Sequence, residues 1–191
     1  MATTRNCHSE LFIACIAAAA VVAFTPGRAA AQARVDPMAE TVAPLLAMVE
    51  RDFVSLADAM PAEKYGFKPT AGEFKGVRTF GEQVKHVACA NFAFYNEIET
   101  KTPPEGCETG GPSPAKTKAE LMAYLRESFA YAGRVLKTLT PANAMEPVGG
   151  PYGGPSTRLG IATLSIWHAS DHYGQLVVYL RLNGIVPPAS R

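Results

Sequence analysis

The 191-residue chain has few histidines, a single tryptophan and almost balanced charge, and each shortage limits what the protein can be. Its 18 basic and 17 acidic residues include neither a basic stripe for nucleic acid nor an acidic tract typical of a disordered tail. Beyond the first 31 residues, the sequence has no long uncharged apolar run of the kind that spans a membrane. We therefore expect a globular domain with no nucleic-acid partner and no membrane span.

Residues 1–31 have the pattern of a cleaved secretory signal peptide. Arg5 supplies positive charge near the start, an apolar run follows over residues 11–24, and Ala29-Ala30-Ala31 provides the small residues of a cleavage site. The apolar run is too short to cross a bilayer comfortably. A lipoprotein anchor at Cys15 is the alternative, but the residues before this cysteine suit it poorly.

Cleavage after Ala31 gives a mature protein of residues 32–191, which has the length of one domain. The leader carries Arg5, Arg28 and Glu10, so its removal changes 18 basic and 17 acidic residues to 16 of each. We predict one exported domain, periplasmic or secreted, with a net charge near zero.

Four segments of the mature chain have the spacing of amphipathic helices, at about residues 38–60, 79–98, 117–139 and 159–182. Apolar residues recur three and four positions apart in each segment, which places them on one face of a helix. Threonine and glutamate three residues apart form predicted capping boxes at the start of the second and third helices. The connections are rich in proline and glycine, which favours loops over strands. The predicted fold is an all-α four-helix bundle.

The predicted buried stripes define how the first and last helices face the core. The first stripe consists of Leu45, Val49, Phe53, Leu56 and Met60. The last consists of Ile161, Leu164, His168, His172, Gln175, Tyr179 and Leu182. Two histidines therefore lie on a core-facing stripe rather than on a solvated one.

The histidines are the most informative residues of the chain. His8 lies in the predicted leader, which leaves His86, His168 and His172 in the mature protein. Residues four apart on a helix project from one face with a single turn between them, so His168 and His172 can grip one ion. A pair of this kind can instead hydrogen-bond to neighbouring groups. His86, on another amphipathic helix, favours a site in which all three bind one divalent metal ion.

Three neutral imidazoles leave a divalent cation with open coordination positions, as in reactive rather than closed structural sites. Zinc and nickel both suit such ligands, and the sequence does not choose between them. The cation could activate water or a thiol for attack. Asp171 points away from the ligands by helix geometry and Glu82 serves as a cap residue, so no catalytic base is identified.

Several motifs together resemble the DinB/YfiT-like metalloprotein superfamily over essentially the whole mature chain. The most specific combination is the segment 79–86, which ends in His86, with the later run 168–175, which contains His168, His172 and Gln175. The end of the chain, residues 179–188, fits as well. The resemblance implies a four-helix bundle in which the three histidines are the metal ligands.

The resemblance implies a metal-dependent hydrolase or transferase that acts on a small molecule. Thiol-dependent transferases and isomerases occur in the family, but export removes this protein from the cytosolic thiols that they use. The alternative is a non-catalytic bundle that binds a metal or another ligand. The family often forms homodimers, and Phe92 and Tyr95, off the main stripe of the second helix, are the expected contacts.

Cys89 and Cys107 are the cysteines that remain after the leader. Export favours a disulfide between them, but the chain after the second helix would have to run almost straight back, at about 3.3 Å per residue, to join them. Metal ligation by Cys89 is the other alternative, although three histidines already fill that role. We predict two free thiols, with Cys89 buried and Cys107 accessible on its loop.

Overall fold

The computed structural model describes residue 1 and residues 37–151 and 156–191. Within those residues the chain forms the helices α1 (Pro37–Ala59), α2 (Phe80–Ile98), α3 (Lys118–Leu136) and α4 (Arg158–Leu182). The predicted all-α bundle is confirmed, and the helix bounds differ from the predicted ones by at most three residues. The predicted leader and its cleavage site lie outside the described residues.

Short elements complete the described part of the chain. They are the 3-10 turns η1 (Ala62–Lys64), η2 (Cys107–Thr109) and η3 (Pro188–Ser190), and the strands β1 (Pro147–Val148) and β2 (Ser156–Thr157). The two strands pair antiparallel, with Pro147 opposite Thr157. The prediction of a loop without strands over residues 140–157 was wrong at this point, because two-residue strands are too short to show a period in the sequence.

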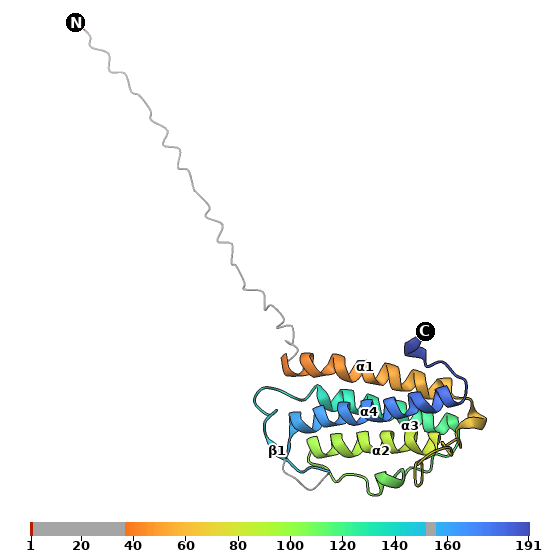
Figure 1. Ribbon diagram of the computed structural model, residues 1–191. Helices are drawn as coiled ribbons and strands as arrows, with labels where there is room; N and C mark the ends of the chain where they lie inside the picture. The colour runs from red at the N-terminus through yellow and green to blue at the C-terminus, as the bar shows by residue number, and fades with distance from the viewer. Residues whose placement is uncertain (2–36, 152–155) are drawn as a thin grey trace. The chain divides into compact units, whose positions relative to one another are not determined.

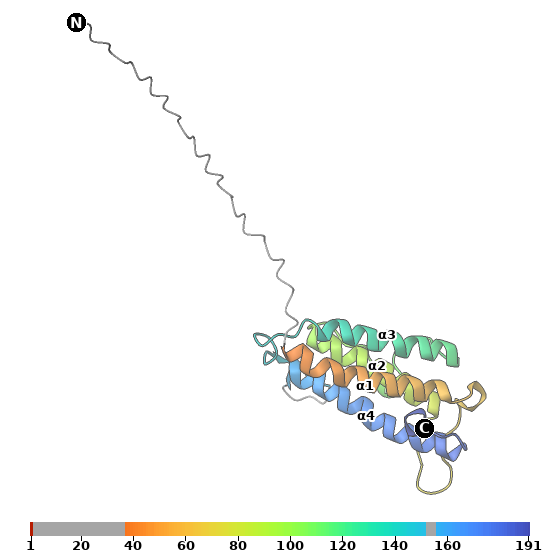
Figure 2. The ribbon, with the colours of Figure 1, turned by 90° about the horizontal axis from the view of Figure 1, so that it is seen from above.

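The four helices pack in the cyclic order α1, α3, α2, α4. Helix α2 contacts α3 and α4, and α1 contacts the same two helices from the opposite side. Figures 1 and 2 show the same arrangement, with α1 and α2 on one diagonal of the bundle and α3 and α4 on the other. Among the described helices, none is long and apolar enough to cross a membrane.

Side-chain contacts give the directions of the helices. Asn91 of α2 donates to Ser128 of α3, and Asn96, further along α2, accepts from Tyr131. Residue numbers therefore rise together, so α2 and α3 are parallel. Helix α4 runs antiparallel to α2, because Gln83 bonds Gln175 whereas Tyr95 meets Ser165.

The core lies between the four helices and is built mainly from aromatic and aliphatic side chains. Phe53 of α1 packs on Phe129 of α3 with 6.4 Å between ring centroids, and both rings are fully buried. Burial of one such side chain stabilises the fold by about 1.5–3 kcal/mol. Three predicted core positions were wrong: Leu45 is 49% and Leu182 56% exposed, and Gln175 is exposed as well. Leu46 is buried in place of Leu45, because the sequence pattern does not decide which of two adjacent leucines faces the core.

The two residues expected at a dimer contact lie in different surroundings. Tyr95 is 0% exposed and its hydroxyl lies 3.0 Å from that of Ser165, so its assignment to an exposed surface was wrong. Phe92 is half-buried and stacks between Tyr124 and Tyr131 of α3. Helix α2 contacts two neighbouring helices, and this extends its buried face beyond the single stripe that periodicity indicates.

A capping box fixes the start of α2, as predicted. The backbone N–H of Glu82 donates to the Thr79 hydroxyl at 3.2 Å, and the Glu82 carboxylate accepts from the Thr79 backbone N–H at 2.7 Å. These bonds satisfy N–H groups that have no partner inside the helix. Because His86 lies one to two turns further on, the cap also fixes the frame that carries this residue.

We predict that Thr79→Ala lowers the free energy of unfolding by about 1 kcal/mol, because a capping hydroxyl is lost. Chemical denaturation monitored by circular dichroism measures the change. Thr163→Ala is the matched control, since this threonine is exposed in the second turn of α4 and does not cap the helix. Equal effects of the two substitutions would contradict a role for the cap.

Cys89 and Cys107 form a disulfide with 5.3 Å between their Cα atoms, so the prediction of two free thiols was wrong. The reason is the parallel arrangement of α2 and α3. After Ile98 the chain must return along the whole of α2 before α3 can begin, and this return carries Cys107 past Cys89. Sequence spacing allowed this path but did not require it.

Replacing both cysteines by alanine is expected to lower the free energy of unfolding by about 3 kcal/mol, because the crosslink closes a loop with a sequence separation of 18. Denaturation of the variant and of the unreduced protein gives the difference. In parallel, a thiol reagent added to the denatured, unreduced protein should label neither Cys89 nor Cys107. Labelling of either one would show that the bond is absent.

Candidate metal centre

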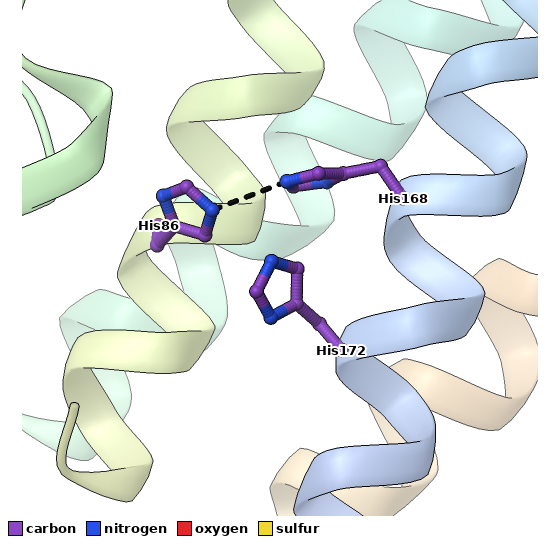
Figure 3. A group of neighbouring side chains, drawn as sticks. All are labelled: His86, His168 and His172. Carbon is purple, nitrogen blue, oxygen red and sulfur yellow. Dashed lines mark hydrogen bonds between the residues drawn. The ribbon is translucent and has the colours of Figure 1, made fainter. Parts of the chain in front are cut away.

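Three histidines from two helices meet between α2 and α4. His86 projects from α2, and His168 and His172 project from α4 one turn apart; their rings converge in Figure 3. Their centroids are 5.0 Å apart for His86 and His168, 4.7 Å for His86 and His172, and 4.5 Å for the α4 pair. The structure thus brings together the three residues that the sequence singled out.

Helix geometry explains why these side chains meet. The spacing of four on α4 places both imidazoles on the face that packs on α2. Since α2 and α4 are antiparallel, one histidine from α2 can lie opposite this pair. The exposed fractions are 4% for His86 and 7% for each of the other two, so the rings are almost removed from water.

A hydrogen bond sets the orientation and tautomer of His86. Its Nδ1 lies 2.7 Å from the backbone carbonyl oxygen of Cys107. A carbonyl only accepts, so Nδ1 carries the proton and donates. The lone pair of the neutral ring is then on Nε2, which lies 3.1 Å from Nε2 of His168. This nitrogen accepts a hydrogen bond from His168 Nε2, and a cation could bind it in place of that proton.

The surroundings keep all three imidazoles neutral. Burial lowers the pKa of His86, lowers that of His172 to about 4, and lowers that of His168 to about 3. Mutual repulsion among the protonated rings and the nearby Arg78 guanidinium act in the same direction. A metal ion binds the neutral imidazole, so the environment favours the form that can be a ligand.

The positions of the nitrogens also fit a metal ion. One ring nitrogen from each residue can be chosen so that all three lie within 4.8 Å of one another. Two nitrogens at 2.0–2.1 Å from a tetrahedral zinc ion are about 3.3 Å apart, so small side-chain movements suffice. Among the described residues, Nδ1 of His168 and Nδ1 of His172 have no hydrogen-bond partner. The cluster could therefore hold a metal ion.

Polar and apolar groups lie on opposite sides of the cluster. One turn before His86, the buried Gln83 donates through Nε2 to Gln175 Oε1 at 2.8 Å, and Gln175 Nε2 donates to Asp171. On the other side, Phe94 packs edge-on against His168 with 5.3 Å between centroids. The site thus has an amide pair along one edge and an aromatic wall along the other.

Comparison with known proteins identifies the family. The sequence profile of the DinB superfamily matches residues 45–176, which is more than half of the chain and includes all three histidines. The chain belongs to the DinB superfamily. A comparison with curated proteins gives no match.

Two solved structures have the same DinB-like fold. A DinB-like protein from Bacillus cereus ATCC 10987 is similar with a TM-score of 0.65 and 18% identity, over 78% of this chain and 95% of that one. A DinB-like protein from Bacillus subtilis gives a TM-score of 0.59 and 19% identity, over 75% and 92% of the two chains. At these identities the likeness concerns the fold alone.

Some contributors to this DinB-superfamily site are not apparent from the sequence. Gln83 lies one turn before His86 on the same face, a spacing that could have indicated it. The Cys107 carbonyl could not be found in this way, because its role depends on the path of the connection and not on a side chain. Asp171 is exposed and Glu82 belongs to the capping box, as predicted.

Protonation should destabilise the metal-free protein. The histidine pKa values are lower in the folded state than the ordinary value of 6.5, so below about pH 6.5 the unfolded chain binds protons that the folded one does not. Stability therefore falls as the pH is lowered from about 6.5 toward about 4, by about 1.4 kcal/mol per pH unit for each such histidine. Denaturation curves of metal-free protein over this range test the slope. His172→Gln should make it shallower, and an unchanged slope would remove His172 from this account.

Proposed function

We propose that this protein binds one divalent cation through His86, His168 and His172 and uses it in a metal-dependent reaction of a small molecule. The observation that carries the proposal is the convergence of three buried, neutral imidazoles from two helices. An uncharged polar ring costs free energy when buried without partners. Nδ1 of His168 and of His172 lack such partners within the described residues, which supports a role other than packing.

A divalent ion held by the three imidazoles would leave coordination positions open and would supply a Lewis acid for a water molecule or a substrate. The chain supplies the orientation of the ligands and the surroundings of these positions. The Cys107 carbonyl holds His86, and Phe94 covers one side of His168. Gln83 and Gln175 offer amide groups that can orient a polar substrate.

Hydrolysis is the reaction that we favour, ahead of group transfer from a thiol. Water needs no second binding site, whereas the small thiols of the cytosol are scarce where disulfides form. The leader pattern of residues 1–31 and the Cys89–Cys107 disulfide both support a periplasmic or secreted location. Zinc and nickel are the ions that suit an all-imidazole set at such a site.

We expect the purified protein to bind about one divalent ion per chain, and His86→Ala, His168→Ala and His172→Ala each to weaken binding at least about tenfold, because one of three shared ligands is lost. Metal analysis after dialysis gives the stoichiometry, and circular dichroism checks that the variants remain helical. Ser170→Ala, on the exposed face of α4, is the matched control. Full retention of metal by any one histidine variant would exclude that residue as a ligand.

Catalysis is tested separately on metal-loaded protein. The turnover of ester, amide and phosphoester substrates by this protein is compared with their turnover by the His168→Ala variant under the same conditions. Turnover that requires both the ion and His168 supports the hydrolase. A loaded protein that turns over none of these substrates would contradict the catalytic part of the proposal and leave a metal-binding bundle.

A further inference from the structure

We infer that the Cys89–Cys107 disulfide is the outer support of His86, so that the metal affinity of the site depends on the oxidation state of this cysteine pair. The inference rests on the proposed metal-binding function and adds regulation by the redox state of the two cysteines. It follows from the position of one backbone carbonyl. That carbonyl belongs to Cys107, which forms the disulfide and also orients the ligand.

The carbonyl lies in a compact turn, Gly106–Gly111. Gly106 O accepts from the backbone N–H groups of Thr109 and Gly111, both at 2.9 Å, and closes the turn around η2. The φ values are positive at three glycines of the turn, which are Gly106 (69°), Gly110 (93°) and Gly111 (68°). Residues other than glycine rarely adopt such values. The turn is therefore well defined internally, but its position on α2 must come from contacts with that helix.

The disulfide supplies the covalent contact. Cys89 is fully buried on α2, one turn after His86. A Cβ at Gly111 would clash with the sulfur of Cys89, so the chain at Gly111 passes directly against the disulfide. The only residue type that fits against the disulfide here is glycine. The bond and the turn are therefore built as one unit on the helix that carries His86.

The other contacts of the turn with its surroundings are weaker. Arg78 donates through Nε and Nη2 to the Glu108 backbone carbonyl. It also forms an ion pair with the Glu108 carboxylate, which is exposed to solvent. An exposed pair contributes at most about 1 kcal/mol. Without the disulfide, this arginine, the flexible Lys85 side chain that lies against Gly110, and the His86 bond itself would have to hold the turn. The Cys107 carbonyl would then sample positions away from Nδ1.

Loss of that bond affects the ligand in two ways. The N–H···O=C interaction fixes which nitrogen faces the ion and raises the basicity of the ring, and groups in this position change metal affinity by about 10- to 100-fold. A freed His86 could also rotate or take the other tautomer. His168 and His172 lie on α4 and are not attached to the turn, so the effect should be confined to one of the three ligands.

The redox step needs only a dithiol as co-reactant. The dithiol transfers two electrons and two protons to the Cys89–Cys107 bond, which breaks into two thiols, and the reductant closes into its own disulfide. Oxidation restores the bond and the turn. The site would thus hold its ion firmly in an oxidising compartment and release it more readily when reduced.

The test compares the zinc affinity of the unreduced protein with that of Cys89→Ala/Cys107→Ala, by competition with a chromophoric chelator. The double variant has no thiol that could bind the ion in a new way. We expect its affinity to be about 10- to 100-fold lower. Val49→Ala, in the core on α1, controls for a general loss of stability and should bind zinc as the wild type does. An unchanged affinity of the cysteine variant would overturn the inference.

A double-mutant cycle shows whether the disulfide acts through His86. The cysteine substitutions are repeated in the His86→Ala background and all four proteins are measured with Cu²⁺, which binds imidazole sites most tightly. The loss caused by the cysteine substitutions should disappear when His86 is absent. The same fold loss in both backgrounds would mean a general effect on the bundle and would overturn the inference.

Reduced wild-type protein, freed of the reductant, completes the experiment. Its zinc affinity should fall as in the double variant. A rise in affinity, with a sulfur-to-metal charge-transfer band when Co²⁺ replaces zinc, would show that the new thiolates ligate the ion and would overturn the inference. A wild type that binds no metal in either state would instead refute the proposed function itself.

Discussion

The parallel direction of α2 and α3 is the constraint on which the site depends. Two parallel helices that are neighbours in sequence cannot be joined by a tight turn, so the chain must travel back along the helix that it has just left. The returning segment crosses α2 where His86 and Cys89 lie. A bundle with alternating directions would have a short connection here, and no carbonyl would reach Nδ1 of His86. The path of the loop is thus as important to the site as the helices that carry the three histidines.

Burial of the histidines is the second structural feature on which the site depends. Three rings with less than a tenth of their surface exposed lose most of their hydration, and the same desolvation keeps them unprotonated near neutral pH. A fold selected only for stability would place aliphatic side chains between α2 and α4, since these need no partners. Aliphatic side chains do occupy buried positions on these two helices, among them Val84, Val87 and Leu176, which are fully buried. Burial of the three imidazoles at the centre of this interface costs free energy, and a bound ion could offset that cost.

Much of this arrangement could be predicted from the sequence, because helix periodicity, capping boxes and the spacing of His168 and His172 are local. His86 could be joined to them because few histidines compete for the role. The direction of α3, the disulfide and the Cys107 carbonyl are different, since each depends on which helices become neighbours. The prediction that Tyr95 is exposed was wrong for the same reason, because a helix that contacts two others buries more of its surface than one stripe indicates. Leu45 and Leu46 show that adjacent apolar residues leave the helix rotation open.

The position of α4 at the end of the chain has a consequence for when the site can form. Contacts of α4 with α1 and α2 join residues far apart in sequence, and such contacts form late because the intervening chain must first be closed into a loop. His86 and His168 are separated by 82 residues. During synthesis His86 and Cys107 emerge well before the α4 pair, so the turn and its crosslink can be in place before the other two histidines arrive. The three-histidine cluster is therefore complete only in the last stage of folding, in whichever compartment α4 docks, and the proposed ion would be taken from that compartment.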